Sequence, residues 1–524
     1  MAGLFRKQGR FDEALVYYEK ALVIIKEKLC DSHPAVARGI SNLASVLLLQ
    51  NRYSEALGHF EDALLIRNAA VGEDLHPGVA STFNNIAIAC SLQGDYEKAL
   101  KCFHKALSIK KRIFGDRHPE TSNLLHSIAE VHCLQGEFEE ALMHHEKALS
   151  ITKETLGNRD PEVAVALGKI AKVCAIQGRS EEALASYEAS LTIAREAVGD
   201  RDVLSVAKTL ENIAAIHYSR NRYKEALHFY EEALSIRKEV SGGRNVLVAD
   251  TLNNIAIVFY AQQRYKEAME YLEAALSIEE EVWGDRHAKV ANTLDNIAAV
   301  HEQQGSFEVA METFEKSLSI KRETLGDHHP DVAESLDKIA AISTDHGNFE
   351  KALECLQESL SHQREAPRCD GHLALAATLS KIAVVYNAQG CLEEASNFCE
   401  EALASIHDAR GASQGSTLDT LGVLYASQGR FERALDCFQR ALTLNKKYLG
   451  NHAGVANTLY HLGVLHLDHG DSKTALSYLR DAERMQLELL GPNDPELGLT
   501  QNSLDACQKG KSCYQILMDR LFGI

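Results

Sequence analysis

A Glu-Ala-Leu motif, or a close variant of it, recurs along almost the whole 524-residue chain. The motif returns at intervals of 39 to 43 residues, and its alanines are Ala14, Ala56, Ala99, Ala141, Ala183, Ala226, Ala268, Ala310, Ala352, Ala395, Ala434 and Ala475. A second small residue follows seven positions later, as at Ala21, and a third precedes the motif by twelve, as at Ala44. Such a register indicates a tandem repeat in which neighbouring units supply one another's core.

Each repeat has the pattern of two antiparallel helices joined by a tight turn. In one unit, Val290, Leu294 and Ile297 recur at helical spacing, and a second helical pattern begins at Phe307. Gly305 lies between the two patterns, where it can take the left-handed conformation that ends a helix. The sequence therefore predicts a helix, a glycine turn and a second helix in every unit.

Further signals mark where these helices begin and end. Asparagine replaces the turn glycine at Asn51 and Asn221, where left-handed geometry is tolerated, whereas Gln263 is a less favourable replacement. Six of the eight prolines share one site that suits the first turn of the next unit: Pro34, Pro77, Pro119, Pro161, Pro330 and Pro495. We therefore expect about twelve stacked helix-turn-helix units.

Composition excludes several functional classes. With 74 acidic against 55 basic residues, the net charge is −19, which argues against a nucleic-acid binder. No apolar stretch approaches the ~18 residues needed to cross a bilayer, so we expect no membrane insertion. The twelve cysteines lack metal-ligand spacing and are expected to be reduced thiols packed in helices, as in a cytoplasmic protein. We expect no metal and no cofactor.

The small residues, spaced twelve and then seven apart, resemble those of the tetratricopeptide repeat. That repeat usually has about 34 residues, whereas most units here have 42 or 43. The longer form, with A-L-S-I-x-x-x-x-L-G-x-x-H-P-x-V-A, is similar to the repeats of kinesin light chains and nephrocystin-type proteins. The resemblance covers roughly residues 1–484 and implies an all-α, right-handed superhelical solenoid of about twelve repeats.

Two departures from that family affect the domain organisation. Ala2 lies twelve residues before Ala14, so the first unit is truncated, and no heptad coiled coil like that of kinesin light chains precedes it. Either the chain is a fragment, or attachment to a motor is not its task. The shortest interval, from Ala395 to Ala434, contains a Gly/Ser-rich link. We therefore expect about ten repeats in residues 1–408, two further repeats in 409–484, and a capping helix and tail in 485–524.

The resemblance implies that the first helices of successive units line a concave groove that binds extended peptides. An asparagine amide can donate to a peptide carbonyl and accept from a peptide N–H, and asparagine recurs two positions before the first-helix alanine. Arg38 and Lys208 lie four residues before such asparagines, a pairing similar to the carboxylate clamp of some family members. The expected peptide-binding residues are Arg38, Asn42, Asn85, Lys169, Lys172, Lys208, Asn212, Asn253, Asn254, Asn296 and Lys338.

Simpler interpretations of these residues stay open. A helical asparagine can face solvent, or it can bond to the neighbouring repeat as a structural staple. The lysines can be solvated rather than bound to acidic peptide side chains. Histidines such as His132 and His217 recur at a packing position, so we expect them to fill the core and not to bind metal.

The sequence favours a non-catalytic adaptor that binds peptide segments or helices of partner proteins. It contains no P-loop, no G-x-S-x-G and no H-E-x-x-H, and the repeats leave no separate domain for catalysis. The alternatives are a scaffold that uses its convex face or its ends, and a regulatory array of a larger enzyme complex. The family resemblance implies kinesin heavy chain or a motor cargo as candidate partners, and a cytoplasmic, cytoskeleton-associated location.

Overall fold

The computed structural model describes residues 2–7, 10–71, 76–197, 203–365, 371–405, 412–449, 452–489 and 495–508. These residues form 25 helices, paired as about twelve helix-turn-helix repeats, which confirms the predicted all-α fold. The chain divides into two compact units, Met1–Val173 and Cys174–Ile524. The predicted division at 408/409 falls in a link outside the described residues and stays a prediction, and the predicted tail at 509–524 also lies outside them.

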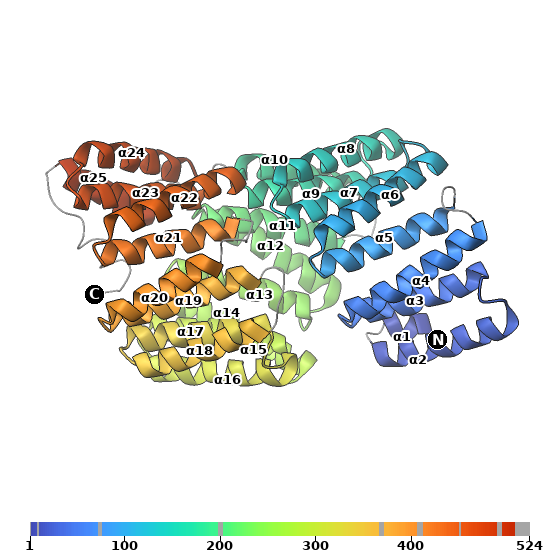
Figure 1. Ribbon diagram of the computed structural model, residues 1–524, viewed down its shortest axis with the longest axis horizontal. Helices are drawn as coiled ribbons and strands as arrows, with labels where there is room; N and C mark the ends of the chain where they lie inside the picture. The colour runs from blue at the N-terminus through green and yellow to red at the C-terminus, as the bar shows by residue number, and fades with distance from the viewer. Residues whose placement is uncertain are drawn as a thin grey trace. The chain divides into compact units, whose positions relative to one another are not determined.

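In the N-terminal unit, antiparallel helix pairs follow one another along the chain (Figure 1). First helices pack against their own second helices, and second helices pack against the first helix of the next pair. The helices are α1 (Ala2–Lys7), α2 (Phe11–Lys28), α3 (Pro34–Leu49), α4 (Tyr53–Val71), α5 (Pro77–Leu92), α6 (Tyr96–Phe114), α7 (Pro119–Leu134) and α8 (Phe138–Leu156), followed by α9 (Pro161–Ile176), within which the unit ends.

The C-terminal unit continues the same pairing and ends with a single helix that packs on the last pair. Its helices are α10 (Ser180–Ala197), α11 (Val203–Ser219), α12 (Tyr223–Ser241), α13 (Val246–Ala261), α14 (Tyr265–Trp283), α15 (Ala288–Gln303), α16 (Phe307–Leu325), α17 (Pro330–Asp345), α18 (Phe349–Glu365), α19 (Gly371–Ala388), α20 (Leu392–Ser405), α21 (Ala412–Ser427), α22 (Phe431–Leu449), α23 (Ala453–Asp468), α24 (Ser472–Leu489) and α25 (Pro495–Gln508).

A histidine side chain caps the start of many first helices. The Nδ1 atom of His118 accepts a hydrogen bond of 3.1 Å from the backbone N–H of Glu120, and Pro119 occupies the first turn. The cap satisfies one of the N–H groups that a helix start leaves without an intrahelical partner. Asn245 does the same for α13 with its amide oxygen. The other histidine caps are His33, His76, His287, His329 and His452.

The predicted turns are confirmed by the backbone. Gly305 ends the turn between α15 and α16 with φ of 76°, in the left-handed region. Asn51, Asn221 and Gln263 occupy the equivalent turn with φ of 61°, 56° and 60°, and they are the residues other than glycine with positive φ in the described chain. Local turn chemistry therefore sets the length of each first helix.

The recurring small residues lie where helices meet. Ala226, Ala268 and Ala310 have no exposed surface. In two units the first-helix alanine is replaced by glycine, and the facing side chain lies too close there for a Cβ atom. A Cβ atom on Gly422 would lie 2.6 Å from the Phe438 ring, and one on Gly463 would lie 2.6 Å from Cγ of Leu479. At these two positions a side chain larger than hydrogen would therefore force the facing residue to shift.

Candidate peptide-binding surface

Three asparagines recur at one position in successive first helices of the C-terminal unit. Asn212 lies on α11, Asn254 on α13 and Asn296 on α15, each two residues before the buried alanine of its helix. Two residues correspond to ~200° around a helix, so the asparagines lie roughly opposite the alanines. Their side chains are half-exposed and make no hydrogen bond with other described residues. We call these three residues the Asn row.

The residue before each member of the Asn row belongs to a polar cluster between helices, whereas the Asn row itself lies at the half-exposed surface. Glu211 is buried, and its carboxylate pairs with both terminal nitrogens of Arg237 from α12, at 2.6 and 2.8 Å. The hydroxyl of Thr251 on α13 donates to the same carboxylate at 3.0 Å. One polar cluster therefore joins three consecutive helices across the boundary between two repeats.

The same cluster recurs two repeats later with a lysine in place of the arginine. Nζ of Lys321 on α16 lies 2.8 Å from Oδ2 of Asp295 on α15 and 2.9 Å from Oγ of Ser335 on α17. Asp295 and Lys321 are almost fully buried, so each charge depends on the other for compensation. Nζ of Lys338 approaches Oδ2 of Asp295 from α17 at 3.1 Å.

In the intervening cluster, the second helix supplies a carboxylate instead of a basic side chain, and the first helix supplies a neutral amide. Asn253 donates its amide to Oγ1 of Thr293 at 2.8 Å and to Oε1 of Glu279 at 3.3 Å, and Thr293 donates to Oε2 of Glu279 at 2.7 Å. Glu279 is 1% exposed, and burial raises the pKa of its carboxyl group above the ordinary value. Asn253 therefore contributes its amide N–H groups to a cluster between repeats, whereas Asn254 does not.

The lysines expected beside the Asn row are paired with carboxylates. Lys208 is exposed, with Nζ 3.6 Å from Oε2 of Glu211. Nζ of Lys338 also lies 3.0 Å from Oε1 of Glu334. These contacts neutralise much of the positive charge that the lysines would bring to a peptide, so the unpaired polar groups at this surface are chiefly the amides of the Asn row.

The remaining candidates lie in the N-terminal unit. Arg38 and Asn42 are exposed on α3, and Asn85 is half-buried on α5. On α9, Lys172 is exposed, whereas Nζ of Lys169 forms an ion pair of 2.9 Å with Oε1 of Glu130 on α7. The structure therefore pairs one of these two lysines within the unit and leaves the Asn42 and Asn85 amides without a hydrogen bond to any described residue.

A sequence model of the tetratricopeptide repeat matches most of the chain, over residues 1–69, 78–154, 120–196, 205–281, 289–365, 374–447 and 413–488. The chain belongs to the tetratricopeptide repeat family. Over 157 residues it is also 25% identical to Protein KINESIN LIGHT CHAIN-RELATED 3 of Arabidopsis thaliana. That alignment covers 28% of this chain and 24% of the relative, so the chain spans about a quarter of the relative's length.

Solved structures also resemble parts of the chain. A putative kinesin light chain from Podosopora anserina, with nearly identical repeats of this type, is 18% identical, with a TM-score of 0.35 over 40% of this chain and 98% of that one. The apo form of the quorum sensor NprR from B. thuringiensis is 18% identical, with a TM-score of 0.46 over 68% of this chain and 98% of that one.

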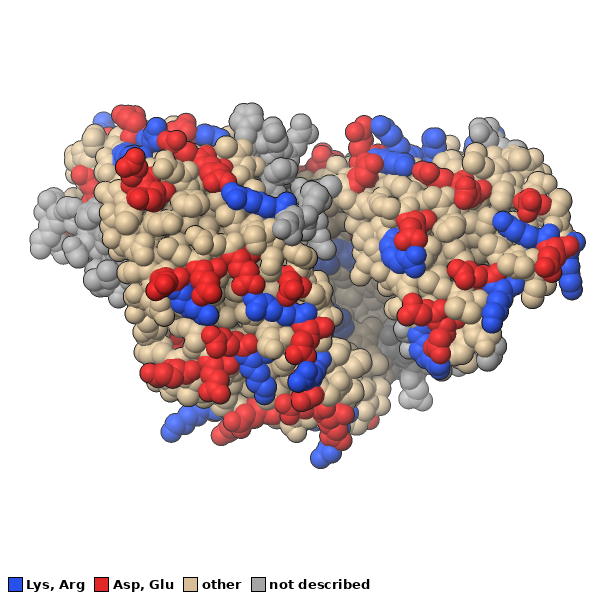
Figure 2. Space-filling model, turned by 60° about the horizontal axis from the view of Figure 1, so that its bottom comes forward, with Lys and Arg blue, Asp and Glu red and all other residues tan. Residues whose placement is uncertain are grey.

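The outer surface of this tetratricopeptide protein carries interspersed acidic and basic side chains on the face drawn in Figure 2. Ion pairs also join successive repeats, such as Arg244–Glu281 and Arg286–Glu323, each at 2.8 Å. No group of three or more His, Cys, Asp or Glu side chains in the described ranges is arranged to hold a metal ion. None of the described helices combines the length and apolar character of a membrane crossing.

Sequence reasoning did not identify the second-helix members of the polar clusters. Arg237, Glu279 and Lys321 each lie 26 residues after a polar residue of the first helix and 14 before a Ser or Thr of the next one. That spacing is visible in the sequence of the tetratricopeptide array, but only the packing of three helices shows that these residues meet. The equivalent position is polar in most repeats, as at Arg67 and Lys110, so a search along the repeat for this recurring polar residue would have found them.

Proposed function

We propose that the Asn row binds extended peptide segments of partner proteins, and that the protein is a non-catalytic adaptor. Tetratricopeptide domains bind peptide segments of other proteins, and the family is generally non-catalytic. The observation that supports this proposal is the contrast between neighbouring residues. Glu211, Asn253 and Asp295 are engaged between repeats, whereas the amides one residue later have no hydrogen-bond partner in the described chain.

The chemistry of the Asn row favours contact with a peptide backbone. Each amide supplies two N–H donors and one acceptor oxygen, which suits the alternating C=O and N–H groups of an extended chain. The amides carry no charge, and the nearby Lys208 and Lys338 are balanced by carboxylates. The surface would therefore hold a peptide through its main chain and select side chains through the residues around the row.

A cargo adaptor resembling kinesin light chains is the more specific form of this proposal. It is supported by the distant relationship to the Arabidopsis protein and by the long repeats. Candidate partners are then kinesin heavy chain or a motor cargo. A scaffold that binds through other faces, or a regulatory array of an enzyme complex, would instead leave the Asn row without a ligand.

The test compares Asn212→Ala/Asn254→Ala/Asn296→Ala with a matched control from which three exposed amides are removed elsewhere, Asn397→Ala/Gln439→Ala/Asn502→Ala. Partners captured from lysate are identified by mass spectrometry, and the segment of each partner that binds is made as a synthetic peptide. The Kd of each peptide for the protein is measured by fluorescence anisotropy. We expect the Asn-row variant to bind such segments at least ~10-fold more weakly, since several hydrogen bonds of about 1 kcal/mol each are lost. The control should bind within about twofold of the wild type.

Circular dichroism first establishes that both variants keep the helicity of the wild type. If the Asn-row variant binds every segment with wild-type affinity, the peptide-binding proposal fails and the scaffold alternative is favoured. Kinesin heavy chain among the partners lost by the variant would support the cargo-adaptor form. Partners lost without any motor component would support a peptide-binding adaptor of another kind.

A further inference from the structure

Three leucines end successive first helices of the N-terminal unit, and each leaves about half of its surface exposed. Leu49 on α3 is 50% exposed, Leu92 on α5 is 52% exposed and Leu134 on α7 is 59% exposed. Each lies five positions after the fully buried alanine of its helix, so the three leucines share one position of the repeat. We call them the Leu row.

The Leu row lies on the exposed face of these three helices. On α3, Asn42, Ser45 and Leu49 recur at helical spacing, and all three are exposed or half-buried. Buried residues of α3, α5 and α7 belong to one hydrophobic core cluster, which holds the three helices side by side. Equivalent residues on the opposite face therefore form one surface that runs across the helices.

The repeat itself does not require leucine at this position. In the C-terminal unit the equivalent residues are Ser219 on α11, Ala261 on α13, Gln303 on α15 and Asp345 on α17. Those helices form the same pairs without a large aliphatic side chain there. Exposed apolar area is unfavourable in water, and apolar area that continues over several residues is typical of an interaction site.

The neighbours of the Leu row add little charge. Ser45, Ile88 and Glu130 lie one helical turn before the three leucines. Ile88 is 37% exposed and extends the apolar area, and the Glu130 carboxylate is already paired with Nζ of Lys169 at 2.9 Å. A strongly acidic or basic segment would therefore find no unpaired opposite charge among these neighbours. The surface is complementary to an uncharged, apolar face of a partner.

The Leu row also continues a surface with candidate peptide contacts. Asn42 and Asn85, two of the expected peptide-binding residues, lie seven positions before Leu49 and Leu92. Seven residues are almost two helical turns, so each asparagine and its leucine share one face of the helix. The apolar row is therefore bordered by polar amides on the same helices.

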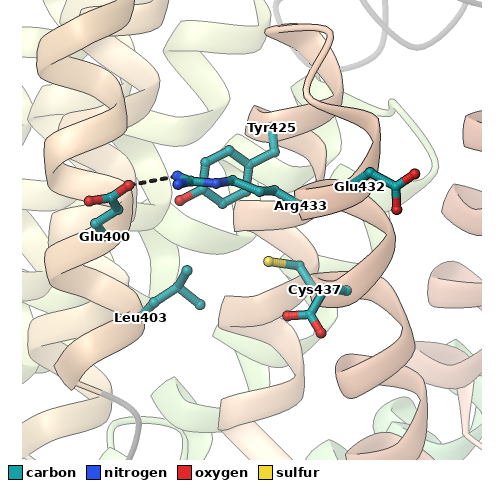
Figure 3. Close-up of a pocket in the computed structure, with 7 residues that line it drawn as sticks. Glu400, Leu403, Tyr425, Glu432, Arg433 and Cys437 are labelled. Atoms are coloured by element: carbon teal, nitrogen blue, oxygen red, sulfur yellow. Dashed lines mark hydrogen bonds and ion pairs between the residues drawn. The ribbon is translucent and has the colours of Figure 1, made fainter.

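The cavity between α20 and α22 in the C-terminal unit differs from this surface, because the chain's own side chains already occupy it. The cavity measures about 590 Å³, and within it Nη1 of Arg433 lies 2.6 Å from Oε1 of Glu400 (Figure 3). The Arg433 guanidinium carbon also lies 5.7 Å from the centre of the Tyr425 ring. These groups are thus engaged with one another, whereas the exposed half of each member of the Leu row faces solvent.

The spacing of the Leu row favours a helical occupant over an extended one. The first helices α3 and α5 are in direct contact. Because packed helices have axes about 8–10 Å apart, neighbouring members of the row are separated by roughly 10 Å. In an α-helix, residues seven apart lie on one face at a distance of ~10.5 Å. In an extended chain, residues ~10 Å apart are three positions apart and point to opposite faces.

We propose that the Leu row binds an amphipathic helix of a partner protein, laid across α3, α5 and α7. Large aliphatic side chains at seven-residue intervals of that helix would pack against Leu49, Leu92 and Leu134, and its charged face would stay in solvent. This surface lies in the N-terminal unit and on other helices than the Asn row. The proposal therefore goes beyond peptide binding at the Asn row and does not depend on it.

The test uses three fluorescent synthetic peptides of the same composition, with leucine as their large aliphatic residue. In the helical probe leucine recurs every seven residues, in the second peptide the leucines are scattered around the helix, and in the third they alternate as in a strand. Binding to the full chain is measured by fluorescence anisotropy. We expect the helical probe to bind at least ~10-fold more tightly than either of the others. Its Kd should change by less than about twofold when the ionic strength is raised, since the contact is apolar.

Variants of the chain locate the binding. Leu49→Ser/Leu92→Ser/Leu134→Ser should bind the helical probe at least ~10-fold more weakly, whereas the same three leucines replaced by methionine should keep the Kd within about threefold. The matched control removes three apolar side chains of comparable or greater exposure from second helices of the same unit, Val23→Ser/Leu65→Ser/Met143→Ser. This control should bind within about twofold of the wild type. Circular dichroism first establishes that all variants keep the helicity of the wild type.

Several results would overturn the proposal. These are no binding of the helical probe, equal binding of the scattered peptide, or an equal loss in the control variant. Tighter binding of the alternating peptide would show that the surface takes an extended segment, and would also overturn it. The Asn-row variant should bind the helical probe within about twofold of the wild type, so a failure of peptide binding at the Asn row and a failure at the Leu row are distinguished.

Discussion

The Nδ1 atoms of His126 on α7 and His145 on α8 lie 2.7 Å apart in the interior of the N-terminal unit. At that distance one neutral imidazole donates its Nδ1–H group to the lone pair of the other, an arrangement that is lost when the accepting Nδ1 takes up a proton. Burial, with a smaller contribution from the positive charge of Lys169, lowers the pKa of His126 to about 4 and that of His145 to about 3. The pair is therefore held neutral by its surroundings.

We expect the N-terminal unit to lose stability in mild acid. In the unfolded chain each histidine takes up a proton near pH 6.5, whereas the folded pair resists protonation until about pH 4, so stability falls as the pH drops through this window. The loss between pH 7.5 and pH 5 should be roughly 2 kcal/mol for each histidine, and so about 4 kcal/mol for the pair. Thermal melts should show a steeper acid dependence for the wild type than for His126→Leu/His145→Leu. The exposed-site variant His228→Asn should keep the wild-type slope, and equal slopes for all three proteins would contradict this account.

Arg237 and Glu211 should contribute strongly to the joint between their repeats. Arg237→Met leaves the buried Glu211 carboxylate with the Thr251 hydroxyl and the exposed Lys208 ammonium as its remaining partners, which should cost about 3–5 kcal/mol. Urea denaturation of the full chain would measure the loss. Arg244→Met provides the control, because its ion pair with Glu281 is exposed and should be worth less than about 1 kcal/mol. Similar losses for the two variants would show that burial does not decide the value of these ion pairs.

Glu279→Gln should stabilise the C-terminal unit at neutral pH. Burial raises the pKa of the Glu279 carboxyl group, so the folded state keeps its proton at a pH where the unfolded chain has already released it. Stability of the wild type therefore falls as the pH rises above the ordinary carboxyl pKa, and the variant removes this loss. Melting temperatures at pH 4 and pH 7 should diverge between the wild type and Glu279→Gln. The exposed neighbour Glu280→Gln should leave both values unchanged.

Gln263→Gly should also stabilise the protein, by about 0.5–1 kcal/mol. Gln263 has φ of 60°, which costs an ordinary residue ~1–2 kcal/mol and costs glycine little. Part of that gain is offset because glycine is more flexible in the unfolded chain. Gln262 has φ of −81°, so Gln262→Gly should destabilise instead. Chemical denaturation of the two variants should give shifts of opposite sign, and a loss at position 263 would refute the strain argument.

Local sequence signals were sufficient to predict the helices of this protein. Proline or a capping side chain begins most first helices, and Gly305 or its equivalents end them, because backbone conformation at these points depends on one or two neighbouring residues. The spacing of the buried alanines likewise predicted which helix faces would meet. For that reason the repeat and its all-α fold could be derived without any knowledge of long-range contacts.

Two adjacent asparagines show which features could be learned only from the tertiary structure. Asn253 and Asn254 are chemically identical in the sequence, yet only Asn253 donates to Glu279 and Thr293. Its partners come from two other helices. Successive residues of α13 point in different directions around the helix axis, and this direction decides which amide reaches the partners. The sequence by itself determined the repeat, the helix ends and the polar positions. Only the packing of three helices determined which polar groups are buried in pairs, because the partners lie up to 40 residues apart along the chain.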